Sequence, residues 1–158
     1  MLLYCKDESF LSDGMSAIRV LEIVLRPNRT QEKKMLDTIG HCCLLYNHLL
    51  EYCREQYEKG EKHPSEFSLN KHITEFKKER PELKDVYAQV LQNVSTRISS
   101  AFDGFFKRIK EKNEAGYPRF KSSQRYDSFT YTQYGFSLKD GHLDLSKVGL
   151  VKAYGIRK

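Results

Sequence analysis

The sequence predicts an α+β fold in which a small β-module is interrupted by a block of helices. Two changes in the spacing of apolar residues support this prediction. Residues 17–26 alternate as a strand does, and residues from 129 onward return to that period of two. Between these segments, apolar residues recur at steps of three and four, which is the period of an amphipathic helix. The order of strand, helices and strands is typical of a β-module with a helical insertion.

Residues 1–16 follow neither period. The sequence therefore predicts that they form an N-terminal extension without an element of the fold, and Met15 is an alternative start to Met1. The first strand of the β-module is predicted at residues 17–27, because the alternating segment ends at Pro27.

The helical insertion is predicted at residues 28–115 and contains three helices. The first begins near Asn28, because a side-chain acceptor three residues before Gln31 has the spacing of a capping box. The second is predicted at residues 68–79 and the third at about residues 83–112. The apolar stripe of the first helix consists of Met35, Ile39, Cys42, Tyr46, Leu49, Cys53 and Tyr57. Three antiparallel helices can bury such stripes against one another.

Residues 116–158 are predicted to hold a basic loop and the remaining strands of the β-module. Alternation predicts strands at residues 129–132, 136–139, 142–145 and 148–156. Asp140-Gly141 lies between two of them and is a strong hairpin signal, because both central residues of a type I′ turn need positive φ.

Length and composition restrict the class of protein. A chain of 158 residues has room for one domain, or for one small domain with an insertion. Its net charge of +6 favours an acidic partner, and a polyanion first. No apolar stretch is long enough to cross a membrane, so we expect no membrane partner. Acidic residues near the N-terminus argue against export, and the four cysteines form no Cys-x-x-Cys pair. We therefore expect a reduced, cytoplasmic protein.

Most of the net charge lies between residues 107 and 127, where seven cations face three acids. The cations are Lys107, Arg108, Lys110, Lys112, Arg119, Lys121 and Arg125. Six aromatic residues lie among or just after them: Tyr117, Phe120, Tyr126, Phe129, Tyr131 and Tyr134. Cations neutralise phosphates and aromatic faces stack on bases, so this pattern favours nucleic-acid binding. The alternative is a solvated loop whose aromatic residues enter the core of the β-module.

We predict that nucleic-acid phosphates contact the last turn of the third helix and the basic loop. The predicted contacts are Lys107, Arg108, Arg119, Lys121 and Arg125.

The sequence favours neither a metal site nor a catalytic site. His41, Cys42, Cys43 and His48 resemble metal ligands in composition only, because neighbouring positions of a helix point about 100° apart. Asp144 is a single acid on a predicted strand, and the chain has no glycine-rich phosphate-binding motif.

Six blocks of the sequence occur in the order and with the gaps of a known family. They are Leu25-Arg26-Pro27-Asn28 before Gln31, Tyr46-Asn47-His48-Leu49-Leu50, Val90-Leu91-Gln92-Asn93, Ala101-Phe102-Asp103-Gly104-Phe105-Phe106, Gly116-Tyr117-Pro118-Arg119-Phe120-Lys121 and Lys147-Val148-Gly149-Leu150-Val151-Lys152. Over about Ile18 to Lys158, the chain resembles the N-terminal half of the TnpB (OrfB) proteins. These are transposon-associated RNA-guided DNA nucleases.

The resemblance implies that the β-module is an incomplete wedge-type β-barrel and that the helical insertion is a recognition lobe. It also implies RNA and DNA as partners: a guide RNA, and a short DNA motif beside the target. Gln92 and Thr132-Gln133 map to positions that face this motif. Glutamine can bond bidentately to adenine and threonine can contact a thymine methyl, which suits an A/T-rich motif. Alternatively, Gln92 is an ordinary exposed residue. Ala88 replaces a lysine of many relatives, and Leu150 replaces their usual tryptophan.

In the family, a nuclease domain with three Mg-binding carboxylates and a small Zn-binding insert follow the region that this chain resembles. None of this lies before Lys158. We therefore expect no catalytic residue, no metal ligand and no cofactor in this chain. We expect a truncated TnpB-type product that does not cut DNA by itself, in the prokaryotic cytoplasm and associated with the nucleoid.

The resemblance also implies that the barrel lacks its closing strands, which leaves an unpaired edge. This edge suggests an alternative function as a protein-interaction fragment. Such a fragment would pair its open β-edge or a helix face with a full-length relative or with a split C-terminal half.

Overall fold

The computed structural model describes residues 2–10 and 16–154, with side chains from residue 22 onward, and confirms the α+β class. The chain divides into two units. We call Met1–Lys34 with Gly135–Lys158 the β-unit, and Met35–Tyr134 the helical unit. Among the described residues, no helix contains a stretch long and apolar enough to span a bilayer.

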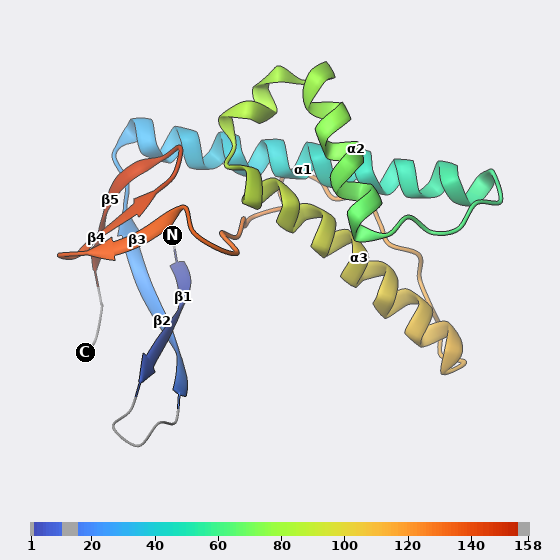
Figure 1. The fold of residues 1–158 in the computed structure, drawn as a ribbon, viewed down its shortest axis with the longest axis horizontal. Helices are drawn as coiled ribbons and strands as arrows, with labels where there is room; N and C mark the ends of the chain where they lie inside the picture. The colour runs from blue at the N-terminus through green and yellow to red at the C-terminus, as the bar shows by residue number, and fades with distance from the viewer. Residues whose placement is uncertain (1, 11–15, 155–158) are drawn as a thin grey trace. The chain divides into compact units, whose positions relative to one another are not determined.

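Five antiparallel strands form the sheet of the β-unit (Figure 1). They are β1 (Leu2–Phe10), β2 (Ser16–Arg26), β3 (Phe136–Lys139), β4 (His142–Leu145) and β5 (Gly149–Tyr154). Their order in the sheet is β1-β2-β5-β4-β3. Among the described strands the sheet is therefore open, with β1 and β3 at its two edges.

The strand β1 corrects the sequence prediction, which places no element in residues 1–16. Residues 2–10 pair with β2 from Leu2 opposite Val24 to Phe10 opposite Ser16. Within the described residues, β2 pairs on its other side with β5 over Val24–Arg26. Along most of its length, β2 therefore has β1 as its hydrogen-bonding neighbour. Such pairing does not require alternating side chains in β1, so periodicity could not predict it.

The predicted hairpin is confirmed. Strands β3 and β4 match the segments predicted at 136–139 and 142–145, and the turn between them has φ of 47° at Asp140 and 72° at Gly141. The last predicted strand, 148–156, corresponds to β5, and its final two residues lie outside the described ones.

The predicted strand at 129–132 is wrong. These residues form no strand and lie along a helix instead. The guanidinium of Arg97 donates to the carbonyl oxygen of Ser128 (3.0 Å) and to Oγ1 of Thr130 (3.1 Å), while Phe129 and Tyr131 pack against the helical core. Alternation showed correctly that one side of this segment is apolar. It could not show that the apolar side faces helices.

The helical unit is built from α1 (Arg29–Glu58), which begins in the β-unit, α2 (Glu66–Glu79) and α3 (Ala88–Lys110) (Figure 1). The first predicted apolar stripe is confirmed at Met35, Cys42, Tyr46, Leu49 and Cys53, which are all buried. Its last member, Tyr57, is 76% exposed, so the stripe ends one turn earlier than predicted.

The third helix begins later than the predicted residue 83. A 3-10 turn occupies Pro81–Asp85, and Val86 and Tyr87 are extended, with ψ of 139° and 133°. Leu83 and Val86 are nevertheless buried. The apolar stripe therefore predicted the burial of this connection correctly and its backbone conformation wrongly.

The predicted capping box at the start of α1 is confirmed, and its glutamine has a second role. The backbone N–H of Asn28 donates to Oε1 of Gln31 (3.0 Å), and the N–H of Gln31 donates to Oδ1 of Asn28 (2.9 Å). The Nε2 of Gln31 also donates to the carbonyl oxygen of Leu150 in β5 (2.7 Å). One side chain thus caps the helix and ties it to the sheet.

We expect Gln31→Ala to lower the free energy of unfolding by about 1–2 kcal/mol, the combined effect of a lost cap and a lost hydrogen bond. Gln31→Glu should lower it less, because a carboxylate still accepts from Asn28 and is favourable at a helix N-terminus. Urea unfolding measures both effects, with Gln56→Ala in α1 as the control. Equal stability of the Gln31→Ala and Gln56→Ala proteins would contradict the dual role.

Candidate nucleic-acid interface

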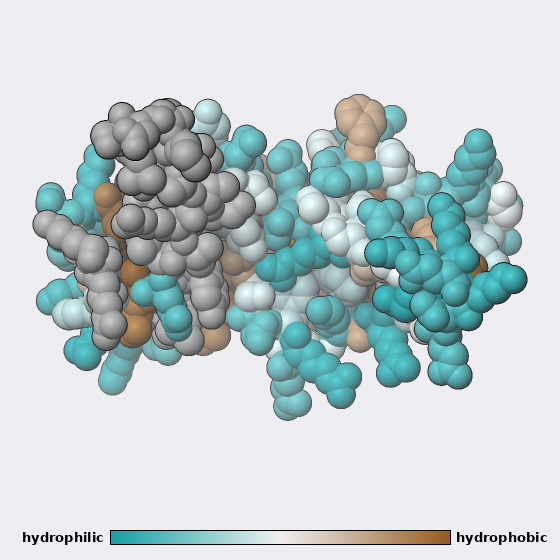
Figure 2. Space-filling model, turned by 90° about the horizontal axis from the view of Figure 1, so that it is seen from below, coloured by the Kyte–Doolittle hydropathy of each residue, from teal (hydrophilic) through white to brown (hydrophobic). Residues whose placement is uncertain are grey.

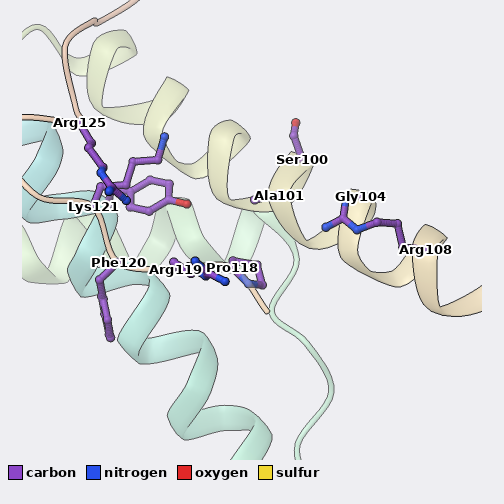
Figure 3. A pocket seen from close by; sticks show the side chains of 10 residues that line it. Ser100, Ala101, Gly104, Arg108, Pro118, Arg119, Phe120, Lys121 and Arg125 are labelled. Carbon is purple, nitrogen blue, oxygen red and sulfur yellow. The ribbon is translucent and has the colours of Figure 1, made fainter. Parts of the chain in front are cut away.

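A basic hollow of about 520 Å³ opens on the surface of the helical unit (Figure 3). Its wall combines one residue of α1, a stretch of α3 and the loop that follows α3. The lining residues are Tyr46, Ser100, Ala101, Gly104, Arg108, Pro118, Arg119, Phe120, Lys121 and Arg125. Four of them are cations, and none of the ten is acidic. The structure thus brings together four of the five predicted phosphate contacts.

The loop that carries three of these cations is fixed to α1 by Asn47. The Oδ1 of Asn47 accepts from the backbone N–H of Lys121 (2.8 Å), and its Nδ2 donates to the carbonyl oxygen of Lys121 (2.8 Å). The thiol of Cys43, one turn earlier, donates to the same carbonyl (3.4 Å). Burial raises the pKa of the Cys43 thiol, which favours the protonated form that can donate. Two of the six sequence blocks, the one that contains Asn47 and the one that ends at Lys121, therefore meet at this contact.

Two aromatic rings lie close to the Lys121 side chain. Its Nζ lies 5.4 Å from the ring centroid of Tyr46 and 5.9 Å from that of Tyr126. Tyr126 is 2% exposed, and burial raises its pKa to about 12. Both rings therefore stay neutral and attract the ammonium group through their faces. This attraction helps to hold Lys121 at the hollow.

Arg108 follows the surface of α3 back towards its N-terminus. Its Nη1 lies 3.5 Å from the position that a Cβ would take at Gly104. Figure 3 shows the guanidinium over this stretch of the helix. A glycine at 104 leaves the helix surface open there, so the guanidinium can lie close to the backbone.

Lys107, the fifth predicted contact, does not line the hollow. Its side chain is 76% exposed, and its Nζ lies 3.9 Å from Oε1 of Glu111. Adjacent residues of a helix point about 100° apart, so Arg108 can face the hollow while Lys107 cannot.

Sequence reasoning missed Arg54. Its Cζ lies 5.1 Å from the ring centroid of Tyr117 and 4.6 Å from that of Phe120, so it supports two residues of the basic loop. Cys43, Asn47 and Arg54 lie at steps of four and seven along α1. This helical spacing is the signal that could have found Arg54.

The aromatic residues of this region are mostly structural. Tyr126 is buried, and Tyr117, Phe129 and Tyr131 pack against the core of the helical unit. Phe120 is 45% exposed and Tyr134 is 80% exposed, so these two remain available for stacking. Four of the six rings therefore enter a core, but it is the core of the helical unit and not that of the β-module, which the predicted alternative named.

Gln92, Thr132 and Gln133 form a second region of exposed residues near the N-terminal half of α3. The backbone N–H of Gln133 donates to Oε1 of Gln89 (3.0 Å), one turn before Gln92. Gln92 and Ser100 are eight residues apart on α3, so this region and the hollow are separated by about 12 Å along the helix.

The residues that resemble metal ligands in composition do not converge. Cys42 and Cys43 are buried thiols, and burial raises the pKa of Cys42 to about 12. The ring of His48 stacks on Phe76 at 3.6 Å, and its Nε2 lies 3.0 Å from Nε2 of His72. Within the described part of the chain, no three histidine, cysteine, aspartate or glutamate residues are grouped so that they could hold a metal ion.

On the face that Figure 2 shows, hydrophilic residues cover most of the described surface.

Two comparisons relate the chain to proteins of known description. Residues 15–62, which contain β2 and α1, match a helix-turn-helix domain of the OrfB/IS605 group. Over 142 residues, the chain is 29% identical to InsQ of Escherichia coli (strain K12), a protein named as an RNA-guided DNA endonuclease. The match covers 87% of this chain and 34% of InsQ, so the chain spans about a third of that relative. The two matches confirm the resemblance to the TnpB/OrfB proteins, the first over residues 15–62 and the second over most of the chain.

Proposed function

We propose that the chain binds nucleic acid and that the basic hollow of the helical unit holds its phosphate backbone. The observation that carries this proposal is the convergence of Arg108, Arg119, Lys121 and Arg125 on one hollow without an acidic residue in its lining. Clustered cations repel one another, and a phosphate polymer relieves this repulsion while releasing its own counterions. Arginine adds bidentate hydrogen bonds to phosphate oxygens.

The name of the InsQ relative supports RNA and DNA as the ligands. In this proposal the helical unit acts as a recognition lobe and the β-unit as the wedge module of a TnpB-type protein, in the prokaryotic cytoplasm at the nucleoid. Both units contact a guide RNA.

A DNA motif beside the target is proposed to contact the region of Gln92, Thr132 and Gln133. These side chains are exposed, and they can reach base edges with the hydrogen-bonding groups that A/T-rich sequences require. Phosphate contacts in the hollow supply affinity, and these three residues supply sequence preference. The proposed role of the described residues is binding, because cations and amides, rather than grouped carboxylates, make up the site.

The salt dependence of binding tests the proposal. A labelled RNA, a single-stranded DNA and a duplex DNA are titrated with the full chain at several salt concentrations. Neutralisation of four or five phosphates gives a slope of log affinity against log salt of roughly −3 to −5. An affinity that does not change with salt would contradict the electrostatic basis of the site.

A further inference from the structure

A row of basic residues crosses the sheet of the β-unit, far from the hollow in sequence. Arg26 of β2 pairs with Lys152 of β5, Lys152 pairs with His142 of β4, and His142 pairs with Lys139 of β3. Directly paired residues on neighbouring antiparallel strands point to the same face of the sheet. The four side chains therefore form one line across four strands, and none of them is buried. We call this line the cross-strand row.

Such a row is unfavourable for the sheet by itself. Like charges directly opposite each other destabilise a strand pair, and Arg26 and Lys152 are such a pair. The ion pairs found among the described side chains all lie in the helical unit, so none of them compensates the row. Asp144, an acidic residue on the same face, is paired with Leu150, and this pair lies two residues along each strand from the pair of His142 and Lys152.

Tyr154 holds two members of the row together. Its ring centroid lies 4.7 Å from Cζ of Arg26 and 5.2 Å from Nζ of Lys152. The negative face of an aromatic ring attracts cations but carries no net charge. The ring therefore orients the two cations side by side and leaves their charge available to a ligand.

The shape of the row indicates the ligand. Four strands at a spacing of about 4.8 Å give a line of about 14 Å. Successive phosphates of one strand of a duplex are about 3.4 Å apart along the axis, so a line of this length faces about four of them. A small anion would need cations that converge on one point, whereas the charges of Arg26, Lys152 and Lys139 are spread along a line and match a chain of phosphates.

We propose that the cross-strand row is a second phosphate-binding site, which holds the backbone of a nucleic-acid strand across the sheet of the β-unit. This inference rests on the proposed function for the class of ligand only. Its residues, its elements and its unit are different from those of the hollow.

The test replaces the row without touching the hollow. The row variant carries Arg26→Gln, Lys139→Gln and Lys152→Gln. The control variant carries Lys62→Gln, Lys78→Gln and Lys84→Gln, three exposed lysines of the helical unit. Each variant removes three positive charges from the net charge of +6, so a general charge effect is the same in both.

We expect the row variant to bind a labelled single-stranded RNA about tenfold more weakly than the control at low salt, with a salt slope shallower by about 2. Parallel titrations with single-stranded DNA and duplex DNA identify which backbone the row prefers. Circular dichroism and thermal unfolding of the row variant should match the wild type or show a higher Tm, because a like-charge pair has been removed. Equal affinities of the row variant and the control for all three probes would overturn the inference.

A single position gives a second, milder test. Tyr154→Phe keeps the ring and should bind as the wild type does, whereas Tyr154→Leu should bind about two- to fivefold more weakly. Equal binding of both proteins would contradict the role of the ring.

Failure of this inference can be distinguished from failure of the proposed function. If a variant of the hollow loses binding while the row variant equals its control, nucleic-acid binding by the hollow is retained and the second site is refuted. The opposite pattern would retain the row and refute the hollow.

Discussion

Replacement of the four cations of the hollow by glutamine is expected to weaken nucleic-acid binding by on the order of a hundredfold at low salt. The changes are Arg108→Gln, Arg119→Gln, Lys121→Gln and Arg125→Gln. The slope of log affinity against log salt should become shallower by about 3 to 4, because about four phosphate contacts are lost. Fluorescence anisotropy with a labelled RNA and a labelled duplex DNA measures both quantities.

The control for this variant removes the same charge elsewhere. Lys33→Gln, Lys62→Gln, Lys78→Gln and Lys84→Gln change four exposed lysines that do not line the hollow. Lys121 also contacts the rings of Tyr46 and Tyr126, so the double variant Arg108→Gln/Arg119→Gln provides a version that leaves these contacts intact. If the quadruple variant and its charge-matched control bind equally, the hollow is not the binding site.

The second large effect is expected at Asn47, which contacts no ligand in the proposal. Asn47→Ala removes both hydrogen bonds to the backbone of Lys121 and should lower the free energy of unfolding by about 2 kcal/mol. Asn47→Asp should lower it at least as much. A carboxylate still accepts from the N–H of Lys121 but places negative charge against its carbonyl oxygen. Urea unfolding measures these changes, with Glu51→Ala on the same helix as the control.

The Asn47 variants should also weaken binding by about tenfold, because the loop that carries Arg119, Lys121 and Arg125 is no longer held in one position. The maximal binding signal at saturating protein should be unchanged. An Asn47→Asp protein with wild-type stability would show that the contact with Lys121 contributes nothing to the fold. An Asn47→Asp protein that is destabilised but binds normally would show that ligand binding does not depend on how this loop is held.

Helices and the hairpin were predictable because their signals are local. The capping box depends on Asn28 and Gln31 alone, and the hairpin turn depends on the backbone freedom of Asp140 and Gly141. Periodicity identified the buried faces of the helices, since burial of an apolar stripe does not depend on which partner covers it. Local signals therefore predicted the elements and their inner faces.

The errors arose where partners far apart in the sequence decide the structure. Residues 129–132 alternate, but helices supply the apolar surface that covers them. Residues 2–10 pair with β2 through backbone groups that every sequence carries. In the same way, charge counting located the basic region but could not separate Arg108 from Lys107, or reveal that Arg26 and Lys139 belong to one row. These facts depend on the register of paired strands or on the orientation of a helix, and charge counting gives neither.

The pairing of β2 with β5 also sets an order of assembly. Val24 of β2 pairs with Tyr154 of β5. This central strand pair therefore joins two segments that come before and after the whole helical unit in the sequence. On a ribosome, every residue of the helical unit emerges before β5 exists, and this unit can begin to fold while β2 still has an exposed edge. A compact insert also shortens the flexible loop that the sheet must close, which lowers the entropic barrier to its last step. Defects in the helices should therefore delay completion of the sheet during synthesis.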